Sequence, residues 1–477
     1  MNPSKPRFCI VGSGPGGFSS ADVLLKAGYQ VEIFESGIDT EGIKFPSLIS
    51  SFQNIWKKGG ASMSFGKDKI AFSEGMGVGG GSLVNSSISQ RINKVKYLDW
   101  QEKFLKEVSY ESFEKNYDQI EDKFNSSLEP VSPISSLFKD LFIKSDLKSI
   151  KLKRFIQKKA LKNIGYLENA YSLEQVNKNN VANVYKEDFL NNGGIIHAKS
   201  KITKVILDKE TSRVKSIEIN GEYERDDFDI FILSAGTTGT PEILNRSGLL
   251  QTKKLPFTLH PTLRLLLEFK NPIDTDQYEL PLYAFEGNGF RIGGSVFNLE
   301  VLGSFVSEDF ENRKHLLRKK NNLMMLYIMI FSNNSNGSLR KKIYSNDLLP
   351  YYELTQEELN NLKEGLLVFS ENCFASKNVN SFFPAIDKTK NILNHESTKE
   401  LIKEKGFRKK MNLMSIHCMS SLPAGGSEVD ENGKLRSLDN LYIFDASILP
   451  SCTETNPQGT IMNVSDLLTK KLINQIS

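Results

Sequence analysis

Phe8-Cys-Ile-Val-Gly-Ser-Gly-Pro-Gly-Gly17 is the stretch of this sequence that decides the fold. Its four apolar residues predict a short buried strand, and glycines 12, 14 and 17 follow in the spacing Gly-x-Gly-x-x-Gly. A helical pattern of apolar residues then continues to Gly28, in the position where a glycine commonly ends a helix. Val31-Glu-Ile-Phe34 predicts the next strand. The chain is therefore predicted to open with a β-α-β unit.

The glycine loop has the features of a dinucleotide-binding site. Its glycines allow a tight turn, close approach of a pyrophosphate and close helix packing, and the helix start offers free N–H groups to phosphates. Glu35 ends the second strand, where a carboxylate binds ribose hydroxyls and repels the 2′-phosphate of NADP. The alternative is a loop that only turns the chain, and the loop alone does not separate FAD from NAD. The candidate residues are Gly12, Ser13, Gly14, Pro15, Gly16, Gly17, Glu35 and Ser36.

Length and composition are those of an ordinary soluble globular protein. The chain has 477 residues, 25% of them charged and 39% hydrophobic, which is sufficient for two domains. A net charge of +4 without a basic tract interleaved with aromatics argues against nucleic acid as a partner. The four cysteines form no Cys-x-x-Cys pair, so neither a metal site nor a disulfide framework is expected. Without a leader or an apolar run of about 18 residues, we expect a cytoplasmic location and no transmembrane segment.

Three further segments resemble motifs of the glucose–methanol–choline (GMC) oxidoreductase family, in the order in which that family carries them. Glu74-Gly-Met-Gly-Val-Gly-Gly-Gly-Ser-Leu-Val-Asn85 resembles its second flavin motif, and residues 77–85 look closest to the bacterial cholesterol oxidase branch. Phe231-Ile-Leu-Ser-Ala-Gly236 with the following 239–248 resembles the next motif, and the stretch 440–460 completes the set. Residues 97–200 and 260–400 resemble the family only diffusely.

The resemblance implies FAD as the cofactor. Some members attach FAD to a histidine at the position that is Val84 here, so non-covalent binding is implied. A helix with Pro457 in its first turn would direct its positive end at the flavin, and small polar groups such as Asn85 and Asp445 suit the ribityl chain and ring edge. The alternative is that these residues only form turns. The implied cofactor residues are Gly77, Gly80, Gly81, Ser82, Asn85, Ser86, Ala235, Gly236, Asp445, Ala446, Pro457 and Thr460.

The predicted fold class is α/β, with a Rossmann-like FAD-binding domain interleaved with a second α+β substrate domain built on an antiparallel sheet. We expect the FAD-binding domain to comprise residues 1–96, 185–255 and 410–477, and the substrate domain to comprise 97–184 and 256–409. Within these, residues 40–75 are expected to be rich in loops, 97–170 mainly helical and 256–350 mostly strands. Thr355-x-x-Glu358 is a capping box that predicts a helix continuing toward Ala375.

His417 and Asn456 occupy the positions of the family's catalytic pair. The resemblance implies that His417 is the base or hydrogen-bonding catalyst and that Asn456 orients the substrate oxygen. Histidine suits this role because its pKa lies near working pH. A single histidine without such motifs is more often structural, and we expect His197, His315 and His395 to be surface residues and His260 to be structural.

The segment after His417 departs from the family's pattern. Ser420 stands where the family usually has glycine, and Ala424 where it has methionine. The substrate-side carboxylate of the cholesterol oxidase branch has only two candidates, Glu286 and Glu300, so a steroid substrate does not follow.

The sequence therefore predicts an FAD-dependent oxidase or dehydrogenase that oxidises a CH–OH group of an alcohol or sugar-type substrate. Hydride would pass to flavin N5 and the hydroxyl proton to His417, and oxygen or another carrier would then accept the electrons. Two rivals remain open because fold alone does not fix function. One is a redox-neutral lyase on the same fold, and the other is a flavoprotein that uses light or binds FAD only as a scaffold.

Overall fold

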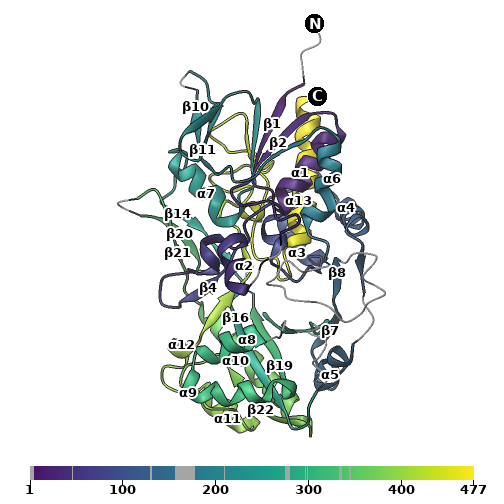
Figure 1. Ribbon diagram of the computed structural model, residues 1–477, viewed down its shortest axis with the longest axis vertical. Helices are drawn as coiled ribbons and strands as arrows, with labels where there is room; N and C mark the ends of the chain where they lie inside the picture. Colours follow the sequence, from purple (N-terminus) through teal and green to yellow (C-terminus); the bar gives the residue numbers. More distant parts are fainter. Residues whose placement is uncertain are drawn as a thin grey trace.

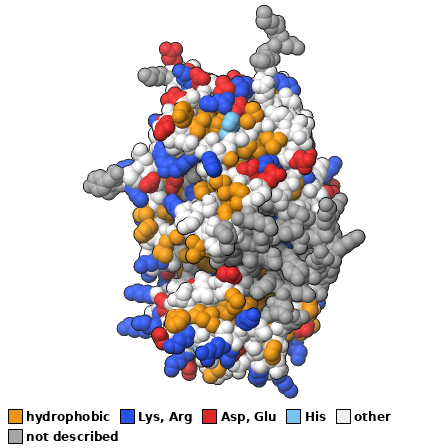
Figure 2. Space-filling view, viewed as in Figure 1, with side chains coloured by type: hydrophobic (Ala, Val, Ile, Leu, Met, Phe, Trp, Pro, Cys, Tyr) orange, Lys and Arg blue, Asp and Glu red, His pale blue; other side chains and the backbone are white. Residues whose placement is uncertain are grey.

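The computed structural model describes residues 5–43, 45, 47–128, 132–155, 178–208, 210–273, 280–295, 297, 299–331, 336–342 and 345–477. The molecule is elongated, with a Rossmann-like half at the top of Figure 1 and a half built on a largely antiparallel sheet at the bottom. The predicted fold class is thereby confirmed. On the face shown in Figure 2, acidic and basic side chains are mixed in the upper half, whereas Lys and Arg predominate along the lower outline.

Among the described residues, a five-stranded parallel sheet forms the upper half in the order β25-β13-β1-β2-β9. α1 (Pro15–Lys26) joins β1 to β2, and Gly28 adopts a φ of +79° just beyond the helix. The β-α-β opening is therefore as predicted. The strands are β1 (Arg7–Val11), β2 (Gln30–Phe34), β9 (Ile195–His197), β13 (Ile230–Leu233) and β25 (Leu441–Ile443).

Helices from distant parts of the sequence cover this sheet. α1 contacts both α6 (Val181–Asn191) and α13 (Gln458–Ile476), and Phe18 of α1 stacks on Tyr185 of α6. A three-stranded sheet of β10 (Ile202–Leu207), β11 (Val214–Ile219) and β12 (Tyr223–Arg225) lies beside α7 (Gly236–Arg246). The N-terminal and C-terminal helices are thus direct neighbours.

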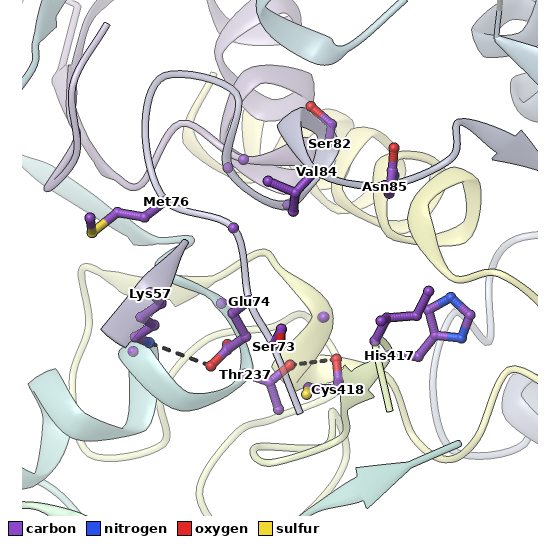
Figure 3. A pocket seen from close by; sticks show the side chains of 18 of the residues that line it. Lys57, Ser73, Glu74, Met76, Ser82, Val84, Asn85, Thr237, His417 and Cys418 are labelled. Carbon is purple, nitrogen blue, oxygen red and sulfur yellow. Dashed lines mark hydrogen bonds and ion pairs between the residues drawn. The ribbon is translucent and has the colours of Figure 1, made fainter. Parts of the chain in front are cut away.

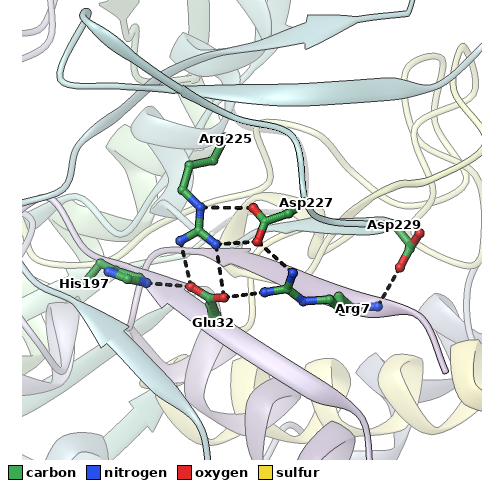
Figure 4. Close-up of polar contacts among 6 residues, drawn as sticks. All are labelled: Arg7, Glu32, His197, Arg225, Asp227 and Asp229. Atoms are coloured by element: carbon green, nitrogen blue, oxygen red, sulfur yellow. Dashed lines mark hydrogen bonds and ion pairs between the residues drawn. The ribbon is translucent and has the colours of Figure 1, made fainter. Parts of the chain in front are cut away.

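A carboxylate on β2 is held by an ion-pair network (Figure 4). Glu32 lies 2.9 Å from Arg225 and from Arg7, and 2.6 Å from His197 Nε2. Asp227 pairs with both arginines in turn. Burial raises the pKa of Glu32, but hydrogen bonds from Arg225 and His197 outweigh it and lower this pKa overall. His197 was expected at the surface, but it is half-buried in this network because its strand, β9, pairs directly with β2.

The lower half of the described chain is a nine-stranded sheet in the order β3-β4-β23-β16-β19-β18-β17-β7, with β22 also paired to β16. α10 (Gln356–Ala375) begins at the predicted capping box and packs on the sheet face that carries Phe290 and Ile328. The strands are β3 (Ser62–Met63), β4 (Ile70–Phe72), β7 (Lys148–Lys151), β16 (Thr262–Phe269), β17 (Tyr283–Gly287), β18 (Phe290–Gly294), β19 (Leu323–Ile330), β22 (Val379–Pro384) and β23 (Leu413–Ser415).

Three expectations about local structure were wrong in part. The loop-rich stretch 40–75 contains helix α2 (Leu48–Ile55), whose apolar residues recur at helical spacing. The mainly helical stretch 97–170 also contains β7 and β8 (Lys153–Phe155), which pair with other strands, and its part from 156 lies outside the described residues. Helices α8 (Leu299–Ser307), α9 (Phe310–Arg313) and η4 (Lys314–Asn322) interrupt the predicted strands of 256–350.

The remaining elements lie outside the two large sheets. They are η1 (Lys57–Gly60), η2 (Gly80–Leu83), β5 (Ile88–Ser89), α3 (Lys94–Gln101), α4 (Tyr110–Lys123), β6 (Ser126–Ser127), α5 (Pro133–Leu141), β14 (Lys254–Pro256), β15 (Thr258–Leu259), β20 (Ser338–Lys341), β21 (Leu348–Tyr351), α11 (His395–Leu401), α12 (Phe407–Lys410), β24 (Cys418–Met419) and η5 (Ala446–Ile448). Among the described residues, none of the helices combines the length and apolar character that a membrane span requires.

The chain crosses between the halves several times. β3 and β4 fall in the stretch 1–96 and β23 falls in 410–477, yet all three belong to the nine-stranded sheet. Segments expected to form the FAD-binding domain therefore also contribute strands to the second sheet. The division into these five segments stays a prediction.

Candidate active site

Two glycine-rich loops meet backbone to backbone at the carboxyl end of β1. A Cβ atom on Gly80 would lie 2.7 Å from the Cα of Gly14, whereas on Gly14 it would approach only Gly80 Cα, at 3.9 Å. Gly12 adopts a φ of +100°, and a Cβ there would lie 2.2 Å from a carbonyl oxygen of Ser234. A Cβ on Gly17 would strike Gly12 O at 2.0 Å, so the third glycine serves helix packing, as its spacing predicts.

Glu35 joins these two loops. Its buried carboxylate accepts hydrogen bonds from the backbone N and the Oγ of Ser13, at 3.0 and 2.7 Å. It also accepts from the backbone N–H groups of Gly37 at 2.9 Å and Gly77 at 3.2 Å. The acid therefore ends β2 at the predicted place and also fixes the relative position of both glycine loops.

Asp445 performs a similar role at the end of β25, the edge strand of the same sheet. It is buried and accepts from Gly236 N at 2.9 Å, Thr240 Oγ1 at 2.5 Å and Ser447 N at 2.7 Å. Burial raises the pKa of this carboxyl group. The side chain thus holds the first turn of α7 against the C-terminal segment, and its two oxygens are engaged by protein groups.

These elements surround one cavity of about 670 Å³. Figure 3 shows Ser82, Val84 and Asn85 on one side, Glu74, Thr237 and Cys418 on the opposite side, and His417 at one end. Most predicted site residues line it, namely Gly12, Gly14, Pro15, Gly16, Glu35, Ser36, Gly80, Gly81, Ser82, Asn85, Ser86, Ala235, Gly236, His417, Asp445, Ala446, Asn456 and Pro457. The other predicted residues, Ser13, Gly17, Gly77 and Thr460, do not line the cavity.

The sequence reasoning missed several residues of the lining. Lys57, at the start of η1, lies 3.7 Å from Glu74 and donates to Thr238 Oγ1 at 2.5 Å, which ties η1 to α7. Gln458 faces the same cavity, and its Oε1 accepts from Asn85 Nδ2. The signal for Gln458 was its place directly after Pro457. Pro457 was expected in the first turn of a helix, but it is the N-cap of α13, and Gln458 is the first helical residue. No sequence pattern marked Lys57.

The described residues fit a flavin dinucleotide. Gly14 and Gly81 expose only backbone atoms to the cavity, and a Cβ on Gly81 would meet no atom within 4 Å. Both glycines therefore leave space for a bound group. The N-terminus of α1 opens at the two glycine loops, where a pyrophosphate would bind. Gln458 Nε2 is buried beside the cavity without a hydrogen-bond partner among the described residues, so it is available to a bound group. A flat ring system with an anionic linker matches this set of donors.

His417 and Asn456 meet at the cavity. Asn456 Nδ2 lies 3.3 Å from His417 Nε2, so the predicted pair is brought together. Burial and the positive charge of Arg291 lower the pKa of His417 to about 3. The ring is therefore neutral over the physiological pH range and retains one unprotonated nitrogen.

His260, expected to be structural, lies directly behind His417. Its Nδ1 is 2.8 Å from His417 Nδ1, its Nε2 is 2.9 Å from the sulfur of Cys452, and the two rings stand at 87°. Burial, reinforced by the positive charges of Arg291 and Lys96, holds the pKa of His260 well below its ordinary value. Sequence alone could not reveal this contact, because 157 positions separate the two histidines.

Two buried cations flank the histidines. Arg291 donates to Gln90 Oε1 at 2.6 Å and to the backbone oxygen of Glu454 at 3.1 Å, and it pairs with Glu286. Lys96 pairs with the Glu454 carboxylate at 3.0 Å. Of the two carboxylate candidates, Glu286 is thus occupied by Arg291, and Glu300 is exposed on α8. Neither lines the cavity.

The nine-stranded sheet supplies the wall beyond His417. Thr262 pairs in register with Met329 and Met414, and the next row places Tyr327 beside Arg264 and Gly293. Thr262 Oγ1 is satisfied by its bond to His260 O at 2.8 Å, and Arg264 pairs with Glu308. The described part of this wall is mainly apolar, with Leu280, Val301, Tyr327, Met329, Met414 and Ile416.

Comparison with known proteins agrees with this geometry. Two family models described as GMC oxidoreductase match residues 52–262 and 339–465. The chain belongs to the GMC oxidoreductase family, whose members are oxidoreductases such as alcohol oxidases, and FAD is the cofactor that family and fold support.

Curated relatives cover nearly the whole chain. An uncharacterised GMC-type oxidoreductase, y4nJ, of Sinorhizobium fredii is 28% identical over 467 residues, covering 95% of this chain and 92% of the relative. The long-chain-alcohol oxidase FAO3 of Arabidopsis thaliana is 22% identical and covers 99% of this chain and 68% of its own length.

Solved structures share the fold. Pyridoxine 4-oxidase from Mesorbium loti superimposes with a TM-score of 0.71 at 13% identity, covering 98% of this chain and 99% of that chain. A formate oxidase variant of Aspergillus oryzae, studied for FAD modification, has a TM-score of 0.71 at 13% identity with full coverage of both chains.

Proposed function

We propose that this protein is an FAD-dependent oxidoreductase that oxidises the CH–OH group of an alcohol, with His417 as the base and Asn456 orienting the substrate oxygen. The observation that carries the proposal is the 3.3 Å approach of Asn456 Nδ2 to His417 Nε2 at the cavity. Burial keeps His417 neutral, so one ring nitrogen is unprotonated and can accept from the substrate hydroxyl. Asn456 would donate its amide hydrogen to the same oxygen.

The reaction divides into a proton and a hydride. The hydroxyl proton moves to His417 Nε2 while the carbon loses hydride, and the alcohol becomes an aldehyde or ketone. Bound FAD supplies the hydride acceptor. Gln458, Asn85 and the start of α13 would contact its ring, and Glu35 and the two glycine loops would hold its dinucleotide part. Because Val84 stands at the attachment position, we propose that FAD is bound non-covalently.

The chamber favours an alcohol with an apolar body over a sugar. Leu280, Met329 and Ile416 are among the apolar side chains beyond His417, whereas Thr262 Oγ1 already donates to His260 O and Arg264 pairs with Glu308. Relatives named long-chain-alcohol oxidase, from Arabidopsis thaliana, are in line with such a substrate. The histidine–asparagine pair also supports a place near the cholesterol oxidase branch. The identity of the electron acceptor, oxygen or another carrier, stays a prediction. The cytoplasmic location also stays a prediction.

The test is the flavin absorbance of the purified protein, mixed anaerobically with pools of aliphatic, aromatic and sugar alcohols. Bleaching by an alcohol pool, reversed by air in the case of an oxidase, would support the proposal. A flavin that no pool bleaches would contradict it and favour the redox-neutral lyase or the photochemical flavoprotein. His417→Ala should lower turnover by roughly 10²–10⁴-fold with FAD retained. The exposed His315→Ala is the matched control and should leave turnover unchanged.

A further inference from the structure

A chain of three buried side chains runs from the candidate base into the protein. His417, His260 and Cys452 are 9%, 0% and 1% exposed, respectively. The links are His417 Nδ1 to His260 Nδ1 at 2.8 Å and His260 Nε2 to Cys452 Sγ at 2.9 Å. Only the Nε2 side of His417 faces Asn456. Both nitrogens of the inner ring are therefore committed to this chain.

Facing Nδ1 atoms leave two possible proton arrangements. Burial and nearby positive charge keep both rings neutral, so each ring carries a single N–H. A 2.8 Å contact between two Nδ1 atoms requires that one donates and the other accepts. If His417 donates, its Nε2 is bare and can act as a base. If His260 donates, His417 carries its proton at Nε2 and cannot accept another there.

The contact at the outer end of the chain distinguishes these arrangements. At the outer end, an amide nitrogen can only donate, so Asn456 Nδ2 beside His417 Nε2 requires a bare Nε2. At the inner end, the Cys452 sulfur accepts from the backbone N–H of Glu454 at 3.4 Å and can also accept from His260 Nε2, which is compatible with that arrangement. The outer contact therefore selects the direction in which His417 donates to His260 and His260 donates to Cys452.

We propose that His260 and Cys452 are positioning residues that hold His417 in the tautomer protonated at Nδ1, with Nε2 free for the substrate proton. Cys452 accepts the Nε2–H of His260, which leaves His260 Nδ1 as the acceptor for His417 Nδ1–H. When His417 takes the hydroxyl proton at Nε2, the same contact stabilises the resulting imidazolium. The inference rests on the proposed function for its catalytic meaning, but the proton arrangement itself can be measured without substrate.

The first experiment measures that arrangement by NMR. The FAD-loaded protein is labelled with 15N at histidine, and the ring shifts and two-bond couplings report which nitrogen of each ring is protonated. The chain has five histidines, so single variants of His197, His315, His395 and His417 to Gln suffice to assign each ring. We expect His417 protonated at Nδ1 and His260 at Nε2. The reverse pattern would overturn the proposal, whether or not the protein oxidises any alcohol.

The second experiment separates positioning from packing. Cys452→Ala removes the acceptor, and we expect a measurable Nε2–H population on His417. We also expect kcat to fall by about 10- to 100-fold, by analogy with the loss that follows when the outer hydrogen-bond partner of a metal-bound histidine is removed. Cys452→Ser keeps an acceptor and should restore both the tautomer and most of kcat. Cys373→Ala removes an equally buried thiol on α10 and should change neither.

Each outcome bears on a distinct statement. An unchanged tautomer and kcat in Cys452→Ala would remove Cys452 from the chain, and an unchanged tautomer in His260→Ala would remove His260. If these variants do not fold, the ring shifts of the unaltered protein still decide the proposal. Failure of every alcohol to bleach the flavin, with the expected tautomers present, would instead reject the proposed function and leave the proton arrangement standing.

Discussion

Lys96 Nζ and Glu454 Oε1 lie 3.0 Å apart, and the lysine side chain is only 3% exposed. This ion pair connects α3 to the loop that carries both Cys452 and Asn456. The same loop is held by Trp100 Nε1, which donates to Ser451 Oγ at 2.8 Å, and by Arg291, which donates to Glu454 O. The candidate catalytic loop is therefore anchored from outside the cavity.

Lys96→Met should release that loop. The substitution keeps the length of the side chain but leaves the Glu454 carboxylate without its partner, so we expect the free energy of unfolding to fall by about 1–3 kcal/mol. Because Asn456 follows two residues later, kcat/KM should fall by about tenfold, equivalent to about 1.4 kcal/mol. Thermal melting and steady-state kinetics check both effects. Lys94→Met, an exposed change on the same helix, is the control. Equal effects in the two variants would contradict an anchoring role for Lys96.

The activity should be insensitive to pH where an ordinary histidine titrates. A base must be neutral to accept a proton, so activity is lost as the pH falls through the pKa of His417. That pKa is lowered to about 3, whereas an unperturbed histidine has a pKa of about 6.5. We therefore expect kcat/KM, measured by anaerobic flavin reduction, to stay level through pH 6.5 and to decline only in strong acid. An inflection near 6.5 would show a base other than the buried His417.

The Glu32 network should make stability depend on acid. The pKa of Glu32 is lowered in the folded protein, so its contribution is complete above the unfolded carboxyl pKa of about 4.3 and is lost as the pH falls below it. Glu32→Gln should lower the free energy of unfolding by about 1.5–3 kcal/mol at neutral pH. The difference in Tm between the two proteins should be full above about pH 4.3 and shrink as the pH falls below it. The exposed Glu210→Gln is the control, and a difference that persists in acid would contradict the electrostatic origin.

Ser420 offers a stabilising substitution. It adopts a φ of +63°, a left-handed conformation that costs a non-glycine residue about 1–2 kcal/mol, and its buried Oγ has no hydrogen-bond partner among the described residues. Ser420→Gly removes the strained backbone conformation and the unpaired hydroxyl. The added glycine raises the entropy of the unfolded state, which lowers stability by about 0.5–1 kcal/mol. We expect a net gain in Tm. Ser421→Gly should lower Tm instead, because the Ser421 hydroxyl donates to Thr237 O at 2.7 Å.

Local chemistry explains what the sequence predicted. Gly12 takes the positive φ that its spacing required, Glu35 ends β2, and the Thr355–Glu358 capping box starts α10 where expected. Ser420 belongs to the same class, since its left-handed backbone shows why the family's pattern has glycine there. Such features depend on a few neighbouring residues, so their signal survives in a single sequence.

Contacts between distant residues explain what was missed. His260 and Cys452 are 192 positions apart, and nothing near either residue indicates that they meet. Arg291 resembles any polar residue of an alternating strand, yet it is almost completely buried and pairs with Glu286 and Gln90. The helix α2 was obscured because serines, which are typical of loops, lie among its apolar residues. Only the folded arrangement distinguishes these residues from their neighbours.

The order of strands in the parallel sheet also has a consequence for how the protein is made. β1 is synthesised well before β25, which completes its sheet, and α1 is synthesised well before its neighbour α13. The first glycine loop therefore stays without these partners until β25 and α13 have been translated. Cofactor loading should be a post-translational event, and a truncated chain without residues 441–477 should not yield an independently folded dinucleotide-binding domain.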